Sequence, residues 1–211
     1  MLPRLYAVCD ADVCARHGWT LQAFAAACLD GGAMLLQLRA KHASSREFLA
    51  DADAVVSRAQ ASGALVIIND RVDVAVLSGA SGVHVGQDDL PPVDARRLAG
   101  PHAMIGLSTH TPSQVAQAAR EPVGYIAVGP VFGTRTKDTG YEAVGLDLVR
   151  LAAEAAAPLG LPVVAIGGIT LDTAPDVIAA GAASVAVITD LLTGGDPVRR
   201  TRAFVDRLGR V

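Results

Sequence analysis

The chain has little of what marks a membrane, secreted or nucleic-acid-binding protein. Only 18% of its 211 residues are charged, and 18 basic residues nearly balance 21 acidic ones, for a net charge of −3. This balance argues against a general nucleic-acid-binding surface. No run approaches the roughly 18 apolar residues of a membrane helix. Asp10 and Asp12 interrupt the apolar start, so no signal peptide and no membrane partner are expected.

Cysteine is also scarce. The three cysteines, Cys9, Cys14 and Cys28, show no CxxC spacing. An odd set of this kind argues against a disulfide framework or a zinc site, and it favours a reducing cytoplasm. The chain has no GxSxG or GxxxxGK[ST] motif, so neither a hydrolase nucleophile nor a nucleotide P-loop is expected.

Apolar residues are abundant, at 51% of the chain, and they gather in eight short continuous runs. Continuous rather than alternating runs are typical of strands buried on both faces, as in a parallel sheet. The predicted strands are Arg4–Cys9, Met34–Arg39, Ala64–Ile68, Gly82–Val85, Ala103–Leu107, Gly124–Val128, Pro162–Ile166 and Ser184–Ile188.

Helix start signals lie between these runs. Ser44 and Glu47 have the spacing of a capping box, Thr111 precedes a proline and a glutamine, and Asp196 precedes Pro197. Eight strand–helix units of about 26 residues each fit a (β/α)8 TIM barrel, with residues 1–211 as one catalytic domain. A doubly wound open sheet is the alternative, but its GxGxxG motif is missing after the first strand. A homo-oligomer is compatible with the sequence.

In such a barrel, the chemistry lies where the strands end. Gln37, Arg39 and Lys41 alternate along the end of the second predicted strand, so their side chains can share one side. Two cations here predict a phosphate or diphosphate site. The alternative is a solvated strand end whose long side chains reach water.

Acidic residues follow the next two strands. Asp70 follows the third strand and Asp89 the fourth, so the two carboxylates could face each other and hold Mg²⁺ beside a diphosphate. Taken alone, Asp70 could instead cap a helix over Val72–Leu77, and Asp89 could serve the turn before Pro91.

A second anion site is predicted further along the chain. Thr134–Lys137 is dense in hydroxyls and cations and opens a long loop, and long loops in compact domains are usually functional. Gly167 and Gly168 follow the seventh strand, where backbone can approach a ligand closely. Loops after strands seven and eight often bind phosphate in these barrels. Two anion sites suggest two phosphorylated small-molecule substrates that become joined.

The sequence resembles the thiamine-phosphate synthase family in seven motifs that occur in family order over nearly the whole chain. The motifs are QLRAK (37–41), INDRVDVA (68–75), GVHVGQDDLP (82–91), GLSTHT (106–111), VGPVFGTRTK (128–137), VGLDLV (144–149) and VAIGGIT (164–170).

The resemblance implies coupling of 4-amino-2-methyl-5-(hydroxymethyl)pyrimidine diphosphate to hydroxyethyl-methylthiazole phosphate, which gives thiamine phosphate and pyrophosphate. It implies Mg²⁺ on Asp70 and Asp89, with Arg39 and Lys137 assisting pyrophosphate departure. The pyrimidine diphosphate would contact Gln37, Leu38, Arg39, Ala40, Lys41, Asn69, Ser108 and Lys137. The thiazole phosphate would contact Thr134, Arg135, Thr136, Gly168, Ile188 and Thr189.

Two departures from the family pattern and two alternatives accompany this interpretation. Thr189 stands where the family often has serine, and residues 138–143 differ from its usual lid. A thiazole tautomerase-like paralogue would use His110 for proton transfer, but it would not need Asp70 or Lys137. A phosphate-metabolite sensor without catalysis would be expected to lack some site residues, and none is missing.

Overall fold

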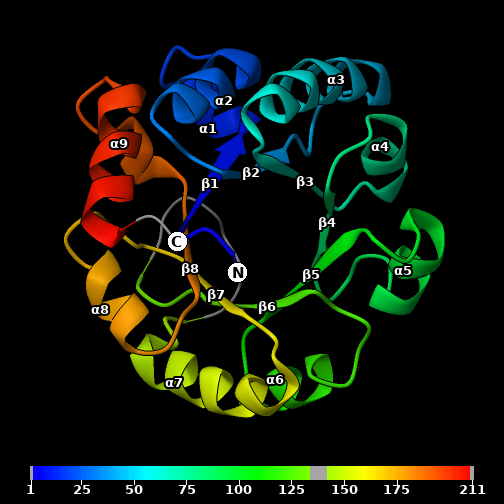
Figure 1. Ribbon diagram of the computed structural model, residues 1–211, viewed down its shortest axis with the longest axis vertical. Coiled ribbons are helices and arrows are strands. Elements are labelled where there is room, and N and C mark those ends of the chain that lie inside the picture. The colour runs from blue at the N-terminus through cyan, green and yellow to red at the C-terminus, as the bar shows by residue number, and fades with distance from the viewer. Residues whose placement is uncertain (1, 134–141, 210–211) are drawn as a thin grey trace.

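The computed structural model describes residues 2–133 and 142–209. Its eight strands form a closed parallel barrel in which each strand pairs with its neighbours in sequence (Figure 1). This arrangement confirms the predicted TIM barrel. The strands are β1 (Leu5–Asp10), β2 (Leu35–Arg39), β3 (Leu65–Asn69), β4 (Gly82–Val85), β5 (Met104–Thr109), β6 (Tyr125–Val128), β7 (Val163–Ile166) and β8 (Ser184–Val187).

Helices surround the barrel as an outer ring (Figure 1). The α-helices are α1 (Ala11–Arg16), α2 (Leu21–Asp30), α3 (Ser45–Ser62), α4 (Val72–Leu77), α5 (Pro92–Ala99), α6 (Pro112–Ala118), α7 (Gly145–Ala156), α8 (Ala174–Ala179) and α9 (Pro197–Leu208). Two short 3₁₀ helices are η1 (Ala157–Leu159) and η2 (Thr189–Leu192). Within the described residues, no helix is long and apolar enough to cross a membrane.

The core has two layers because alternate residues of each strand face opposite sides. Leu36 and Leu38 of β2 pack in the larger cluster between the barrel and the helices. Leu35 of the same strand belongs to the cluster inside the barrel, together with Tyr6 and Tyr125. The continuous apolar runs arise because both faces are buried. The same alternation carries Gln37 and Arg39 toward the barrel interior.

The helix start signals act as predicted. Ser44 and Glu47 form both halves of a capping box at α3. The Thr111 hydroxyl accepts a hydrogen bond from the Gln114 N–H at 3.2 Å, and the Asp196 carboxylate accepts one from the Arg199 N–H at 3.0 Å. The capping alternative for Asp70 is wrong, because α4 begins after Arg71 and has no side-chain cap.

The barrel closes where the last strand meets the first. Leu5 pairs with Val185 and Ala7 with Val187 in parallel register. The Ser184 hydroxyl adds a 3.4 Å hydrogen bond to the Arg4 carbonyl at the start of this seam. Closure leaves no open sheet edge and brings all eight carboxyl ends of the strands to one face.

Candidate active site

The described residues enclose a cavity of about 570 Å³ at the carboxyl ends of the strands. This volume suits a small-molecule site. Its walls include most of the predicted site residues: Gln37, Arg39, Lys41, Asn69, Asp70, Asp89, Ser108, Gly168, Ile188 and Thr189.

Part of the predicted set lies elsewhere. Leu38 and Ala40 pack against the core between barrel and helices, so strand alternation keeps both side chains out of the cavity. Side chains of this segment reach the cavity only from Gln37, Arg39 and Lys41, and contact of the whole segment 37–41 with the pyrimidine diphosphate stays a prediction. Thr134, Arg135, Thr136 and Lys137 lie outside the described residues, as do positions 138–141 of the expected lid.

Arg39 is held by a partner that sequence reasoning missed. Its Nη1 donates to Oδ2 of Asp10, the last residue of β1. Asp10 is only 3% exposed, and its Oδ1 accepts from the Val13 N–H at 3.1 Å. The carboxylate thus caps α1 and fixes the guanidinium at the cavity wall. A polar residue directly after a buried strand, as at Asp70, was the signal available in the sequence.

Asp70 has the geometry of a strained functional residue. Its φ of 63° makes it the one non-glycine residue with positive φ among those the structure describes. The Lys41 Nζ lies 3.3 Å from its Oδ2, and its backbone N–H donates to the His84 carbonyl at 2.8 Å. Burial and the neighbouring Asp89 carboxylate raise the pKa of Asp70, and Lys41 opposes this rise.

The Asp70–Asp89 pair fits a divalent cation. Two carboxylates close enough to raise a pKa repel each other when both are ionised, and a cation between them removes that repulsion. Asp89 is also oriented, since its Oδ2 accepts from the Gly86 N–H at 2.7 Å. The described residues contain no cluster of three or more His, Cys, Asp and Glu side chains suited to a metal. Two protein ligands suit Mg²⁺, which usually takes its remaining ligands from water and substrate phosphates.

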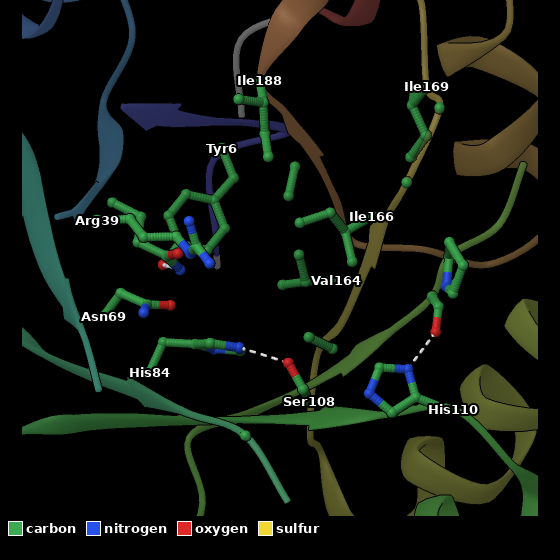
Figure 2. Close-up of a pocket in the computed structure, with 18 of the residues that line it drawn as sticks. Tyr6, Arg39, Asn69, His84, Ser108, His110, Val164, Ile166, Ile169 and Ile188 are labelled. Carbon is green, nitrogen blue, oxygen red and sulfur yellow. Dashed lines mark hydrogen bonds between the residues drawn. The ribbon is translucent and has the colours of Figure 1, made fainter. Parts of the chain in front are cut away.

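A chain of hydrogen-bonded polar side chains forms the floor of the cavity, with Tyr125 buried beneath the surface of that floor. The Gln37 Nε2 lies 2.9 Å from the Tyr6 hydroxyl, which lies 3.0 Å from the Tyr125 hydroxyl. The Nδ1 of His84 lies 2.9 Å from the Tyr125 hydroxyl, and its Nε2 lies 2.8 Å from the Ser108 hydroxyl (Figure 2). The sequence gives no signal for this chain of contacts, because Tyr6, His84 and Tyr125 lie within predicted apolar strands.

The opposite part of the cavity is apolar and glycine-rich. Val164, Ile166 and Ile188 lie across from Arg39 and Asn69 (Figure 2). The adjoining part of the wall is backbone, because Gly167 and Gly168 follow β7 with φ of 104° and 65°. A Cβ on Gly168 would lie 2.8 Å from the Gly133 carbonyl oxygen, so this position has room only for glycine.

Hydrogen bonds from the loop after β7 and from α9 hold the loop after β8 in place. The Asp190 Oδ2 accepts from the Leu171 N–H at 3.0 Å and from Nη2 of Arg200 at 2.7 Å. Arg200 belongs to α9, so that helix and the loop after β7 both hold the turn that carries Ile188 and Thr189. The arrangement positions backbone and hydroxyl donors at this end of the cavity.

Comparison with known proteins agrees with this geometry. The family model described as thiamine monophosphate synthase matches residues 5–191. A thiamine-phosphate synthase of Koribacter versatilis is 44% identical, covering 98% of this chain and 96% of that protein. One from Thermus thermophilus is also 44% identical, with 99% and 98% covered.

Solved structures show the same relationship. Thiamine phosphate pyrophosphorylase from Pyrococcus furiosus superposes with a TM-score of 0.84 at 29% identity, covering 97% of this chain and 95% of that one. A 3-hexulose-6-phosphate synthase, at 16% identity and a TM-score of 0.67, shares only the fold. The match over residues 5–191 and the identity across nearly the full chain place this protein in the thiamine monophosphate synthase family.

Proposed function

We propose that the protein joins 4-amino-2-methyl-5-(hydroxymethyl)pyrimidine diphosphate to hydroxyethyl-methylthiazole phosphate, releasing thiamine phosphate and pyrophosphate. The observation that carries the proposal is one cavity, in a chain of this family, with cations and paired carboxylates at one end and a glycine loop at the other. The first end suits a diphosphate and the second a phosphate. We further propose that residues 1–211 act as one catalytic domain.

In the reaction, the C–O bond to the diphosphate breaks and its electron pair leaves with pyrophosphate. The thiazole nitrogen then uses its lone pair to form the new C–N bond. No proton moves in the coupling, so no general base is required, and the aminopyrimidine ring stabilises the positive methylene carbon. Catalysis therefore depends mainly on stabilising the charge of the leaving group.

The chain's own groups divide this work. Arg39, fixed by Asp10, and Lys41 lie where they can bind diphosphate oxygens, and Ser108 lines the same cavity. Lys137 is proposed to join them from the loop. Asp70 and Asp89 would hold Mg²⁺, which when bound neutralises negative charge on the diphosphate. Val164 and Ile166 keep water from the reactive carbon, where it would otherwise give the pyrimidine alcohol.

At the other end, we propose that Gly168, Ile188 and Thr189 bind the thiazole phosphate, together with Thr134–Thr136. Close packing of the loop after β7 against Phe132 and Gly133 supports this, because it aligns backbone groups on one wall. The Thr189 hydroxyl can replace the serine common in the family. The three cysteines are free and buried, which suits the cytoplasmic location that we also propose.

A single-turnover assay tests the proposal. Enzyme in excess is mixed with both phosphorylated substrates, with Mg²⁺ or with EDTA, and pyrophosphate and thiamine phosphate are quantified. We expect stoichiometric formation of both products only with Mg²⁺. Binding of thiazole phosphate without coupling would overturn the proposal in favour of the tautomerase-like or sensor alternatives. Coupling in the presence of EDTA would contradict only the proposed requirement for Mg²⁺ and would leave the proposed reaction standing.

A further inference from the structure

The hydrogen-bonded floor of the cavity crosses the barrel in one unbroken path. It passes from Gln37 on β2 to Tyr6 on β1, then to Tyr125 on β6, His84 on β4 and Ser108 on β5, with each step between 2.8 and 3.0 Å. Gln37 and Ser108 line the cavity at the two ends, whereas Tyr125 is fully buried and does not. The path thus connects two points of the substrate site through the protein interior.

The number of protons on each group decides which partner donates in every hydrogen bond of the path. The Gln37 Nε2 can only donate, so the Tyr6 oxygen accepts, and the single Tyr6 proton is left for the Tyr125 oxygen. The Tyr125 proton then goes to Nδ1 of His84, which places the imidazole proton on Nε2. From there it is donated to the Ser108 oxygen. The Ser108 proton remains as a donor toward the cavity.

Both phenols stay protonated, as this direction requires. Burial raises the pKa of Tyr6 and of Tyr125 well above the ordinary value near 10, so each hydroxyl carries one proton at neutral pH. Turning the Gln37 amide around would reverse every bond in the path. Ser108 would then donate to His84, and its oxygen would face the cavity only as an acceptor.

Packing holds the middle of the path in place. The rings of His84 and Tyr125 stack with centroids 5.6 Å apart, and Tyr6 meets Tyr125 edge-on at 6.0 Å. Gly106 makes this possible, since a Cβ there would lie 2.1 Å from Cζ of Tyr125 and 2.6 Å from Nδ1 of His84. The ring positions are therefore set by the barrel itself rather than by a ligand.

We propose that this path is a one-directional hydrogen-bond relay that fixes Gln37 Oε1 as an acceptor for the amino group of the pyrimidine and the Ser108 hydroxyl as a donor to the departing diphosphate. The inference rests on the proposed function. An aminopyrimidine supplies a donor and a diphosphate supplies acceptors, so one direction of the path suits both ends. Tyr6 and Tyr125 are positioning residues, because they act through Gln37, His84 and Ser108. No proton is transferred along the relay.

The first test measures the His84 tautomer without any substrate. The protein is labelled with ¹⁵N-histidine, and the His84 ring signals are assigned by comparison with His84→Asn. We expect a pyrrole-type Nε2 and a pyridine-type Nδ1 in the free protein. In Tyr125→Phe this preference should be lost, because the donor to Nδ1 is gone. A wild-type His84 protonated on Nδ1 would overturn the inference whether or not the enzyme couples the proposed substrates.

The second test compares substrates. The amino- and hydroxypyrimidine diphosphates are used as competing substrates with wild type, Tyr6→Phe and Tyr125→Phe. Loss of one neutral hydrogen bond should reduce discrimination for the aminopyrimidine about 3- to 10-fold in Tyr6→Phe. In Tyr125→Phe, kcat should fall by a similar factor while KM for the thiazole phosphate stays unchanged. Unchanged discrimination and unchanged kcat in both variants would overturn the relay.

Ser184→Ala is the matched control. It removes a buried hydroxyl that donates to the Arg4 carbonyl at the barrel seam, outside the path. It should retain wild-type tautomer and kinetics. Thermal melting confirms that each variant is folded before kinetics are compared. If one tyrosine variant does not fold, the other still tests the relay. Failure of the wild type to couple either diphosphate would refute the proposed function but leave the tautomer measurement to decide the relay.

Discussion

Arg39 and Asp10 form an ion pair at the rim of the cavity, and the carboxylate is more deeply buried than the guanidinium, at 3% against 15% exposed. Asp10 also accepts the Val13 N–H, so among the residues that the structure describes its charge has one hydrogen-bond donor besides Arg39. The pair joins the ends of β1 and β2 in register, since Asp10 lies opposite Arg39. The cation that we propose binds the diphosphate is thereby held in place in the free protein.

Removing only one member of this pair should cost stability. Arg39→Ala leaves a buried carboxylate with a single hydrogen bond, and we expect a loss of about 1–3 kcal/mol in unfolding free energy. The double variant Asp10→Asn/Arg39→Ala should regain part of that loss, because the buried charge is gone. Urea denaturation of both single variants and the double variant measures the coupling. Additive losses would show that the pair does not interact energetically.

The activity of the same variants should separate the two residues. Arg39→Ala and the double variant should both lose most of the coupling activity, whatever their stability. Asp10→Asn keeps Arg39 but weakens the contact that holds its guanidinium in place. KM for the pyrimidine diphosphate should therefore rise about 10-fold, while KM for the thiazole phosphate is unchanged. Equal changes in both KM values would assign Asp10 a general structural role.

Asp70→Asn should stabilise the free protein while abolishing most of its activity. Asparagine tolerates positive φ, and it removes the buried charge and its repulsion from Asp89, which together raise the pKa of Asp70. We expect a gain of about 0.5–1 kcal/mol at pH 7 and a fall in kcat of about 10²-fold or more. A carboxyl whose pKa is raised in the folded state destabilises the fold at pH values above its pKa in the unfolded chain. In acid, Asp70 is protonated in both states, so the stability gained by Asp70→Asn should disappear.

Asp73→Asn is the control for that experiment. Asp73 lies three residues away on α4, and its exposed ion pair with Arg71 lowers its pKa. Its substitution should therefore reduce stability at pH 7, by at most about 1 kcal/mol, and leave activity intact. Stability changes of the same sign in both variants would contradict the repulsion assigned to Asp70.

Gly168→Ala tests the glycine loop against a matched glycine. Gly168 and Gly160 have nearly equal φ, 65° and 64°, but a Cβ would meet the Gly133 carbonyl only at Gly168. Gly160→Ala should cost about 1 kcal/mol of stability through backbone conformation alone, with normal kinetics. Gly168→Ala should cost more and raise KM for the thiazole phosphate. Identical kinetics of the two variants would remove this loop from the phosphate site.

The buried thiols should make the protein sensitive to alkali. Burial raises the pKa of Cys14 from its ordinary value of 9.0 to about 12. Between these values the unfolded chain loses the thiol proton and the folded chain keeps it, so stability is full below pH 9 and declines toward pH 12. Cys14→Ala should weaken the decline, as measured by urea midpoints at pH 8, 10 and 11. An unchanged decline would assign it to other groups.

The sequence predicts the barrel well because its signals are local. Each continuous apolar run overlaps an observed strand, and the capping residues Ser44 and Thr111 begin the helices expected of them. The cavity wall formed by Gln37, Arg39 and Lys41 follows from the same local alternation. That rule also shows why Leu38 and Ala40 face away, although the resemblance alone assigned the segment as a whole.

The polar floor could not be predicted, because its contacts depend on how the strands are staggered around the barrel. Tyr6 and Tyr125 are 119 residues apart, and nothing near either one indicates the other. The pairing of Asp10 with Arg39 likewise requires the register of β1 against β2. The positive φ of Asp70 depends on tertiary contacts. Taken alone, Asp70 in the sequence favoured a helix cap over a metal ligand, and only Asp89 after the next strand raised the metal prediction.

The seam between β1 and β8 has a consequence for how the protein is made in the cell. Ala7 pairs with Val187, so the ring cannot close until the ribosome has produced almost the entire chain. At roughly 5–20 residues per second, β1 waits about 10–35 s for its second neighbour. Throughout that interval one apolar strand edge stays unpaired on the nascent chain. Synthesis speed and chaperone capacity, rather than the stability of the finished barrel, should therefore limit its yield on overexpression.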